Sequence, residues 1–230
     1  MHNILDHGYV RTVNVMGSDL DVVNAARASF EKEVNELSDN DVKLISFLVK
    51  NGHDSTLRHC AMTFEVYAPL MVARQWYKHA VSSTHLDDQN GWNESSRRYI
   101  SENEVFYIPG VKEWRSVPEN RKQGSGEPVD DFIGAKYTRA MQKLTEDYLQ
   151  VYREALADGV APEQARLLLP AYAMYVRWRW TASLNSLLHF ISLRQHSHSQ
   201  SEIQAYADAV FAEVQNAFPI TATEWLAHRV

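Results

Sequence analysis

Cysteine is nearly absent from this 230-residue chain, which carries only Cys60. A single cysteine excludes an internal disulfide framework and any zinc site built from several thiolates. The sequence also begins without a basic segment that leads into an apolar run, so we expect no signal peptide and a location in the reducing cytoplasm. No stretch approaches the roughly 18 uninterrupted apolar residues of a membrane span, so we expect no membrane partner.

Positive charge is in slight deficit, because 23 Lys and Arg face 29 Asp and Glu, for a net charge of −6. This balance argues against sequence-independent nucleic acid binding, which depends on clustered cations. The apolar share of 45% and the charged share of 23% are ordinary for a globular protein. We therefore expect a single domain over residues 1–230 that buries a substantial core.

Residue periodicity in the first half indicates both strands and helices. Alternation of apolar and polar residues over 9–15 and 60–67 is typical of half-buried strands, and 105–108 is a shorter candidate. Apolar residues recur at helical spacing in three further segments. These segments are 19–30, 39–50 and 70–79.

The second half is predominantly helical. Proline and glycine concentrate in 109–128, which we interpret as a surface loop. A long helix is then expected to end at Gly159, and a shorter one begins at Pro162. The last two expected helices span about 182–194 and the segment after a capping box of Ser199 and Glu202. The pattern predicts an α+β fold, helix-rich, with a small antiparallel sheet.

The densest polar cluster is QNGWNESSRRY, residues 89–99. Arg97 and Arg98 beside Ser96 suit a phosphate, because guanidinium groups bind phosphate oxygens bidentately. Glu94 is suited to accept from a sugar hydroxyl or a base N–H. A solvated loop accounts for the same composition, so the residues alone leave both interpretations open.

Other segments also admit two interpretations. In 74–79, Trp76 and Tyr77 either stack on a ligand ring or belong to an amphipathic helix. His53 and Asp54 form a metal-ligand pair or, more simply, a turn. His196 and His198 are better suited to hydrogen bonding than to a metal.

Two arginines and the cysteine complete the candidates. Arg166 and Arg194 lie in otherwise apolar helical segments, where a guanidinium needs an anion or a partner. Cys60 follows His59, but adjacent strand residues point to opposite faces, so a small buried hydrophobic role is favoured over a nucleophile.

Taken in order, these groups resemble the flavin-dependent thymidylate synthases. That family carries an Arg-Gln-Trp block running into Arg-His-Arg, followed by a spacer and Asn-Glu-x-Ser-x-Arg-Tyr. The corresponding segments are 74–80 and 93–99. Further matches in collinear order are ILDHGYV, AARASF, Gly52-His53, FYIP, Pro162-Glu163 with Ala165-Arg166, and LHFISLR ending at Arg194.

The resemblance implies a thymidylate synthase-complementing-protein-like fold and a homotetramer with shared active sites. It implies conversion of dUMP to dTMP with FAD, NADPH or NADH, and methylenetetrahydrofolate, without a cysteine nucleophile and without a metal. Arg194 would be catalytic, by stabilising negative charge on the uracil ring. The positions matched to dUMP binding are Gln75, Glu94, Ser96, Arg97, Arg98, Arg166 and Arg194. The positions matched to the flavin and folate are His53, Ser55, Lys78, His79, Glu94, Asn185 and His189.

The chain departs from the family pattern on the flavin side. Lys78 and Ala80 replace the two arginines of Arg-His-Arg, Asn185 lies where an arginine is common, and THLDDQNGW (84–92) lengthens the spacer. Two alternative functions therefore stay open. One is an HD-type metal-dependent phosphohydrolase built on His53 and Asp54, and the other is a non-catalytic nucleotide-binding relative.

Overall fold

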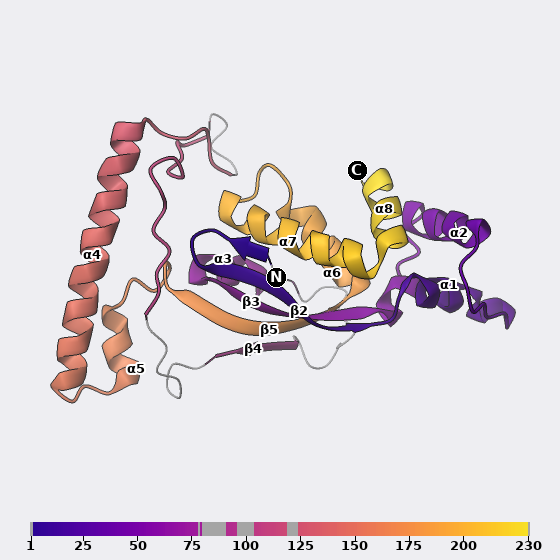
Figure 1. Ribbon diagram of the computed structural model, residues 1–230, viewed down its shortest axis with the longest axis horizontal. Coiled ribbons are helices and arrows are strands. Elements are labelled where there is room, and N and C mark those ends of the chain that lie inside the picture. The colour runs from indigo at the N-terminus through magenta and orange to yellow at the C-terminus, as the bar shows by residue number, and fades with distance from the viewer. Residues whose placement is uncertain (1, 78, 80–90, 96–103, 119–123, 230) are drawn as a thin grey trace.

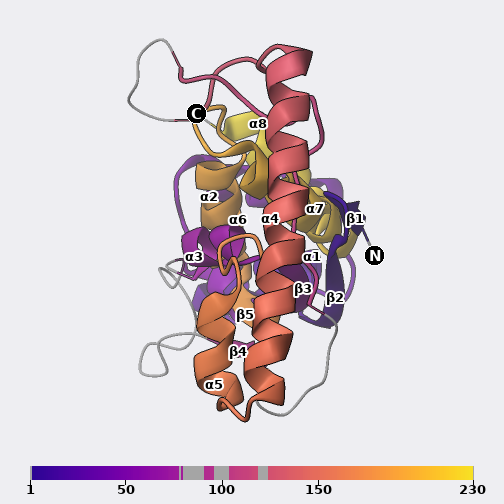
Figure 2. The ribbon, with the colours of Figure 1, turned by 90° about the vertical axis from the view of Figure 1, so that its left-hand side faces the viewer.

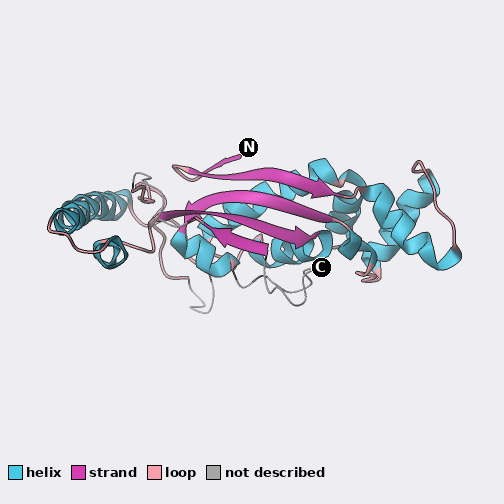
Figure 3. Ribbon diagram, turned by 90° about the horizontal axis from the view of Figure 1, so that it is seen from below, coloured by secondary structure: helices cyan, strands magenta, loops and turns pink. Residues whose placement is uncertain are grey.

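A computed structural model describes residues 2–77, 79, 91–95, 104–118 and 124–229. Its strands form one antiparallel sheet in the order β1-β2-β3-β5-β4, and helices α3, α6 and α7 cover one face (Figures 1 and 3). The strands are β1 (His2–Ile4), β2 (Gly8–Met16), β3 (Ala61–Pro69), β4 (Gly91–Glu94) and β5 (Tyr175–Ser183). The longer helices are α1 (Asp19–Arg27), α2 (Asp39–Lys50), α3 (Leu70–Trp76), α4 (Asp131–Ala157), α6 (Leu184–Arg194), α7 (Ser201–Ala217) and α8 (Pro219–His228). The expected helix-rich α+β class is confirmed.

The two central strands, β3 and β5, divide their side chains between a core face and an open face. Phe64 lies opposite Trp180, and both are buried. On the other face, the next pair along the strands is Glu65 and Arg179, and Arg11 of β2 donates to Glu65 at 3.0 Å. Because successive side chains along a strand point to opposite faces, the sheet has an apolar face under the helices and a charged face away from them.

Several predicted elements are wrong in extent or type. Residues 105–108 form no strand, only an isolated bridge between Phe106 and Met174. The helix expected over 182–194 begins two residues later, because β5 runs to Ser183. The expected capping box is absent: α7 begins at Ser201, and its N-cap, Gln200, makes no side-chain cap. Strands β1, β4 and β5 and the separate helix α8 were not predicted.

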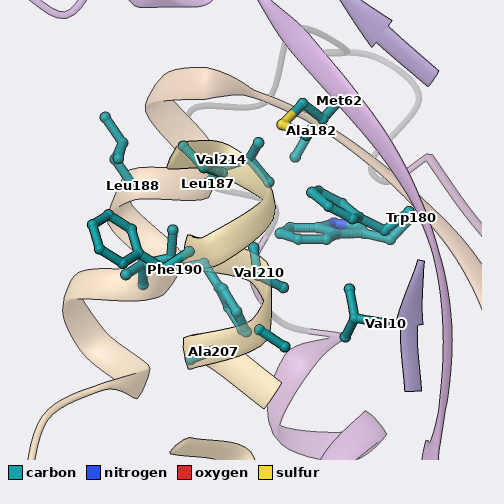
Figure 4. Close-up of a cluster of buried hydrophobic side chains, with 14 of the residues drawn as sticks. Val10, Met62, Trp180, Ala182, Leu187, Leu188, Phe190, Ala207, Val210 and Val214 are labelled. Carbon is teal, nitrogen blue, oxygen red and sulfur yellow. The ribbon is translucent and has the colours of Figure 1, made fainter. Parts of the chain in front are cut away.

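Helices α6 and α7 hold the core against the sheet (Figure 4). Leu187 and Phe190 of α6 pack with Val210 of α7 and with Trp180 of β5, and each of these side chains is at most 2% exposed. The first residue of α6, Leu184, donates its backbone N–H to the Cys60 carbonyl at 2.8 Å. The sheet therefore fixes the position of the first residue of α6. Because the helix is rigid, the position of its last residue, Arg194, is fixed as well.

Helix α4 stands apart from this core. Figures 1 and 2 show it at one end of the sheet beside the one-turn helix α5 (Pro162–Ala165), which leads into the 3₁₀ turn η3 (Arg166–Leu168). Of its 27 residues, α4 buries only Gly134 and Thr145. Its exposed apolar side chains are Phe132, Ile133, Tyr137, Leu144, Tyr148 and Val151. Such a surface on a monomer marks an interaction face.

Candidate functional site

A cavity of about 1420 Å³ opens beside the C-terminal end of α6. Gln75 of α3 and Arg194 of α6, both candidates for nucleotide binding, line it together. The other lining residues are Met71 of α3, Met141 of α4 and members of the segments 107–115, 124–125, 170–173 and 192–202. The cavity thus collects residues from six separate parts of the sequence.

Arg194 is held in place by two neighbours. Its Nε donates to Nε2 of His79 at 2.9 Å, and one terminal nitrogen donates to the Gln75 backbone carbonyl at 3.4 Å. Burial lowers the Arg194 pKa, but a guanidinium stays protonated in proteins. The remaining N–H groups form a fixed cationic donor at the cavity wall, suited to an anion or a polarised carbonyl.

His79 is 8% exposed and packs edge-on against Phe190, with ring centroids 5.0 Å apart. Burial, the Arg194 charge and His189 together lower its pKa from 6.5 to about 4. The neutral ring accepts from Arg194 through Nε2, so its proton resides on Nδ1. His79 therefore orients Arg194 without adding charge.

This lowered pKa predicts a loss of stability in acid. The unfolded imidazole binds a proton below about pH 6.5, whereas the folded one resists until about pH 4. The stability that neutral His79 contributes is thus complete above pH 6.5 and is lost as the pH falls toward 4, by at most roughly 3 kcal/mol. Denaturant unfolding near neutrality and near pH 5 measures it. His79→Gln should flatten the pH dependence and His189→Gln should not; equal slopes in wild type and His79→Gln would contradict the assignment.

The other flavin-side candidates follow α6 toward its beginning. Asn185 lies in its first turn and is 8% exposed, and His189 lies one turn on with its ring 6.4 Å from that of His79. His53 and Ser55 are exposed and precede the 3₁₀ turn η2 (Thr56–His59), which packs against α6. The ten residues from Asn185 to Arg194 span about 14 Å along the helix.

Some candidates are not brought to the cavity. Arg166 is exposed on η3, donates to the Glu163 carbonyl and lies next to α4, outside the cavity lining. Glu94 ends β4 opposite Trp178. Burial against neighbouring side chains raises the pKa of its carboxyl, although the residue as a whole is exposed in the single chain. The remaining candidates, Lys78, Ser96, Arg97 and Arg98, and most of 84–92 lie outside the described residues.

Ring contacts decide between the two interpretations of residues 74–79. Trp76 is fully buried and stacks on Phe190 with centroids 4.5 Å apart, so it is a core residue. Tyr77 is 49% exposed and meets Trp92 edge-on. Trp92, the last residue of the lengthened spacer, stacks on Trp178 at 4.6 Å. The end of the spacer is therefore an edge strand rather than a loose loop.

The cavity is also lined by residues of the segment 109–128, for which the sequence predicts a surface loop. Trp114 donates to Thr138 of α4 at 3.0 Å, and Arg115 and Ser125 lie with it along the lining. Gly124 has φ +75°, and a Cβ there would lie 3.2 Å from the His198 backbone. This positive φ beside a close backbone favours glycine at this position.

Cys60 is fully buried, and its thiol lies 3.7 Å from the Ser18 carbonyl, outside the cavity lining. Burial and the nearby Asp21 raise its pKa to about 12, so the thiolate nucleophile is not formed near neutrality. Cys60→Ala should leave turnover within about twofold of wild type and cost about 1 kcal/mol of stability through lost packing. Steady-state turnover and thermal unfolding test this; abolished turnover in a folded variant would restore the thiol mechanism.

Comparison with known proteins covers nearly the whole chain. Residues 11–220 match the family described as thymidylate synthase complementing protein. A flavin-dependent thymidylate synthase from Thermotoga neapolitana is 38% identical over 210 residues, which are 90% of this chain and 85% of that protein. The enzyme of the same name from Ehrlichia ruminantium is 33% identical over 220 residues, 96% of this chain and 71% of that protein.

A solved structure has the same fold. The UMP/dUMP methylase PolB from Streptomyces cacaoi, bound with 5-Br dUMP, superposes with a TM-score of 0.82. Its sequence is 30% identical, and the match covers 99% of this chain and 98% of that one. Within the described residues, no group of three or more His, Cys, Asp or Glu is placed to hold a metal, and no helix is long and apolar enough to span a membrane.

Proposed function

Because the chain belongs to the thymidylate synthase complementing protein family, whose matched relatives are flavin-dependent thymidylate synthases, we propose that it converts dUMP to dTMP. The proposed co-substrates are methylenetetrahydrofolate as one-carbon donor and NADPH or NADH as reductant, with FAD as cofactor. The observation that carries the proposal is the pairing of Arg194 and Gln75 at one cavity, joined through the Gln75 carbonyl.

Arg194 is suited to the uracil ring. Its guanidinium is fixed by His79 and Gln75, so no reorganisation is needed when negative charge develops on the ring. A preorganised cation in a partly buried site stabilises that charge more than water does. Arg194 thereby makes the C5–C6 bond reactive without a covalent protein nucleophile, in agreement with the buried, protonated Cys60.

The residues along α6 fit a flavin. Asn185 is 8% exposed at the start of α6, and its amide offers both a donor and an acceptor to a polar ligand. His53, Ser55 and His189 present exposed hydrogen-bonding side chains near the same helix. Bound there, FAD supplies the oxidation and reduction that turn a transferred one-carbon group into a methyl group. The chain's residues hold and orient it.

We further propose a homotetramer in which a neighbouring copy completes each site. Arg166 is matched to nucleotide binding, yet it lies exposed on η3 beside α4, outside the lining of the cavity in its own chain. The apolar face of α4 is exposed in the single chain. Self-association through α4 covers this face and carries Arg166 to a partner's nucleotide.

Spectroscopy of the purified protein tests the function. We expect a bound or readily added flavin, its bleaching by NADPH under anaerobic conditions, and formation of dTMP from dUMP when methylenetetrahydrofolate is added. A protein that binds dUMP without turnover would be the non-catalytic relative. Stoichiometric metal without flavin would indicate the phosphohydrolase, which the relatives do not favour.

A further inference from the structure

Gln75 has both of its amide protons occupied within the protein. Its Nε2 lies 3.4 Å from the Met71 backbone carbonyl, which only accepts, so this end of the amide is the NH₂ group. The same Nε2 donates to Oε1 of Gln200 at 2.6 Å. The Gln75 Oε1 makes no hydrogen bond to a described residue, which leaves an acceptor for a ligand in the cavity.

Gln200 is itself held in one orientation. Its Nε2 lies 3.6 Å from the Met71 sulfur, a weak acceptor, so its Oε1 is the end that faces Gln75. Its backbone carbonyl accepts from the Gln204 N–H at 3.1 Å and begins α7. Both the backbone and the side chain of Gln200 are therefore held in place. Its Oε1 accepts from Gln75 and so sets the orientation of the Gln75 amide.

We propose that Gln200 is a positioning residue that fixes the Gln75 amide with its oxygen toward the substrate and so selects uracil over cytosine. This inference rests on the proposed function. Arg194, which donates to the Gln75 backbone carbonyl, lines the same cavity as the Gln75 side chain and supplies a donor there. A donor next to an acceptor matches a uracil carbonyl next to its N3–H. Cytosine placed the same way turns an unprotonated N3 toward the fixed oxygen, which leaves two acceptors unpaired.

The test compares dUMP and dCMP binding to the flavin-loaded, full-length protein by calorimetry. Wild type should favour dUMP. Gln200→Leu frees the Gln75 amide to rotate and should narrow the ratio of the two affinities by about tenfold. Gln200→Glu keeps an acceptor that holds Gln75, so it should retain the ratio even though its charge weakens both phosphorylated ligands alike.

Gln204→Leu is the matched control, because Gln204 donates its amide to the Ser199 carbonyl at 2.6 Å on the first turn of α7 but does not line the cavity. It should keep the wild-type ratio. An unchanged ratio in Gln200→Leu, or a ratio in Gln200→Glu as narrow as in Gln200→Leu, would overturn the positioning role while the proposed function stands. A wild-type protein that binds neither flavin nor dUMP overturns the proposed function and this inference with it.

Discussion

Arg194→Ala is expected to lower kcat for dTMP formation by about 10²- to 10³-fold, because it removes the fixed donor that stabilises charge on the ring. Arg194→Lys should recover only a small part of the rate, since a lysine cannot both donate to His79 and keep several donors in the cavity. Single-turnover measurement with saturating dUMP separates this loss from weaker binding.

The matched control is Arg179→Ala. Arg179 is exposed on the open face of the sheet, paired with Glu65 at 3.9 Å, and outside the cavity lining. It should leave kcat unchanged. Thermal unfolding and flavin content establish that the Arg194 variant is folded, because it also loses its bonds to His79 and Gln75. Turnover of folded Arg194→Ala within about threefold of wild type would refute its role.

Mixing two inactive variants should restore activity. If a neighbouring copy supplies Arg166, then Arg166→Ala and Arg194→Ala subunits assembled together form some sites with both arginines intact. If the subunits assemble at random, about one quarter of the sites contain both Arg194 and Arg166. Turnover should then reach about one quarter of the wild-type value. Co-expression with two affinity tags isolates the mixed assemblies, and each variant alone should be nearly inactive.

The chain offers a matched control for this experiment. Gln75 and Arg194 lie in the same subunit, joined through the Gln75 carbonyl at 3.4 Å. A mixture of Gln75→Ala and Arg194→Ala should therefore recover nothing, since no site has both. Recovered turnover in the mixture of Gln75→Ala and Arg194→Ala would contradict the proposed shared site. So would a mixture of Arg166→Ala and Arg194→Ala that stays inactive.

Local signals in the sequence predicted the elements nearest the motifs. Alternation over 60–67 and helical spacing over 39–50 correspond to β3 and α2. Asn51 and Gly52, at φ +65°, end α2 as expected. Strand β5 was not predicted, although Val176, Trp178 and Trp180 alternate with arginines there in the pattern typical of a half-buried strand.

The sequence points to candidate site residues where the residue type itself is unusual for its surroundings. It does not point to residues that reach the cavity only through contacts distant in the sequence. An arginine in an apolar segment made Arg194 a candidate, and the structure places it half-buried in the cavity lining. Nothing local marks Gln200, which matters only because it lies 2.6 Å from a residue 125 positions earlier. Trp114 likewise reaches the cavity through a bond to Thr138, a contact that no periodicity encodes.

The buried state of Cys60 makes the chain a ready host for site-specific probes. Because this is the only cysteine and its thiol is protonated and enclosed, a cysteine introduced at an exposed position becomes the single reactive thiol, with no cysteine-free background to prepare. Lys50, exposed at the end of α2, is one such position. A fluorophore pair attached there through Lys50→Cys would report subunit exchange in real time.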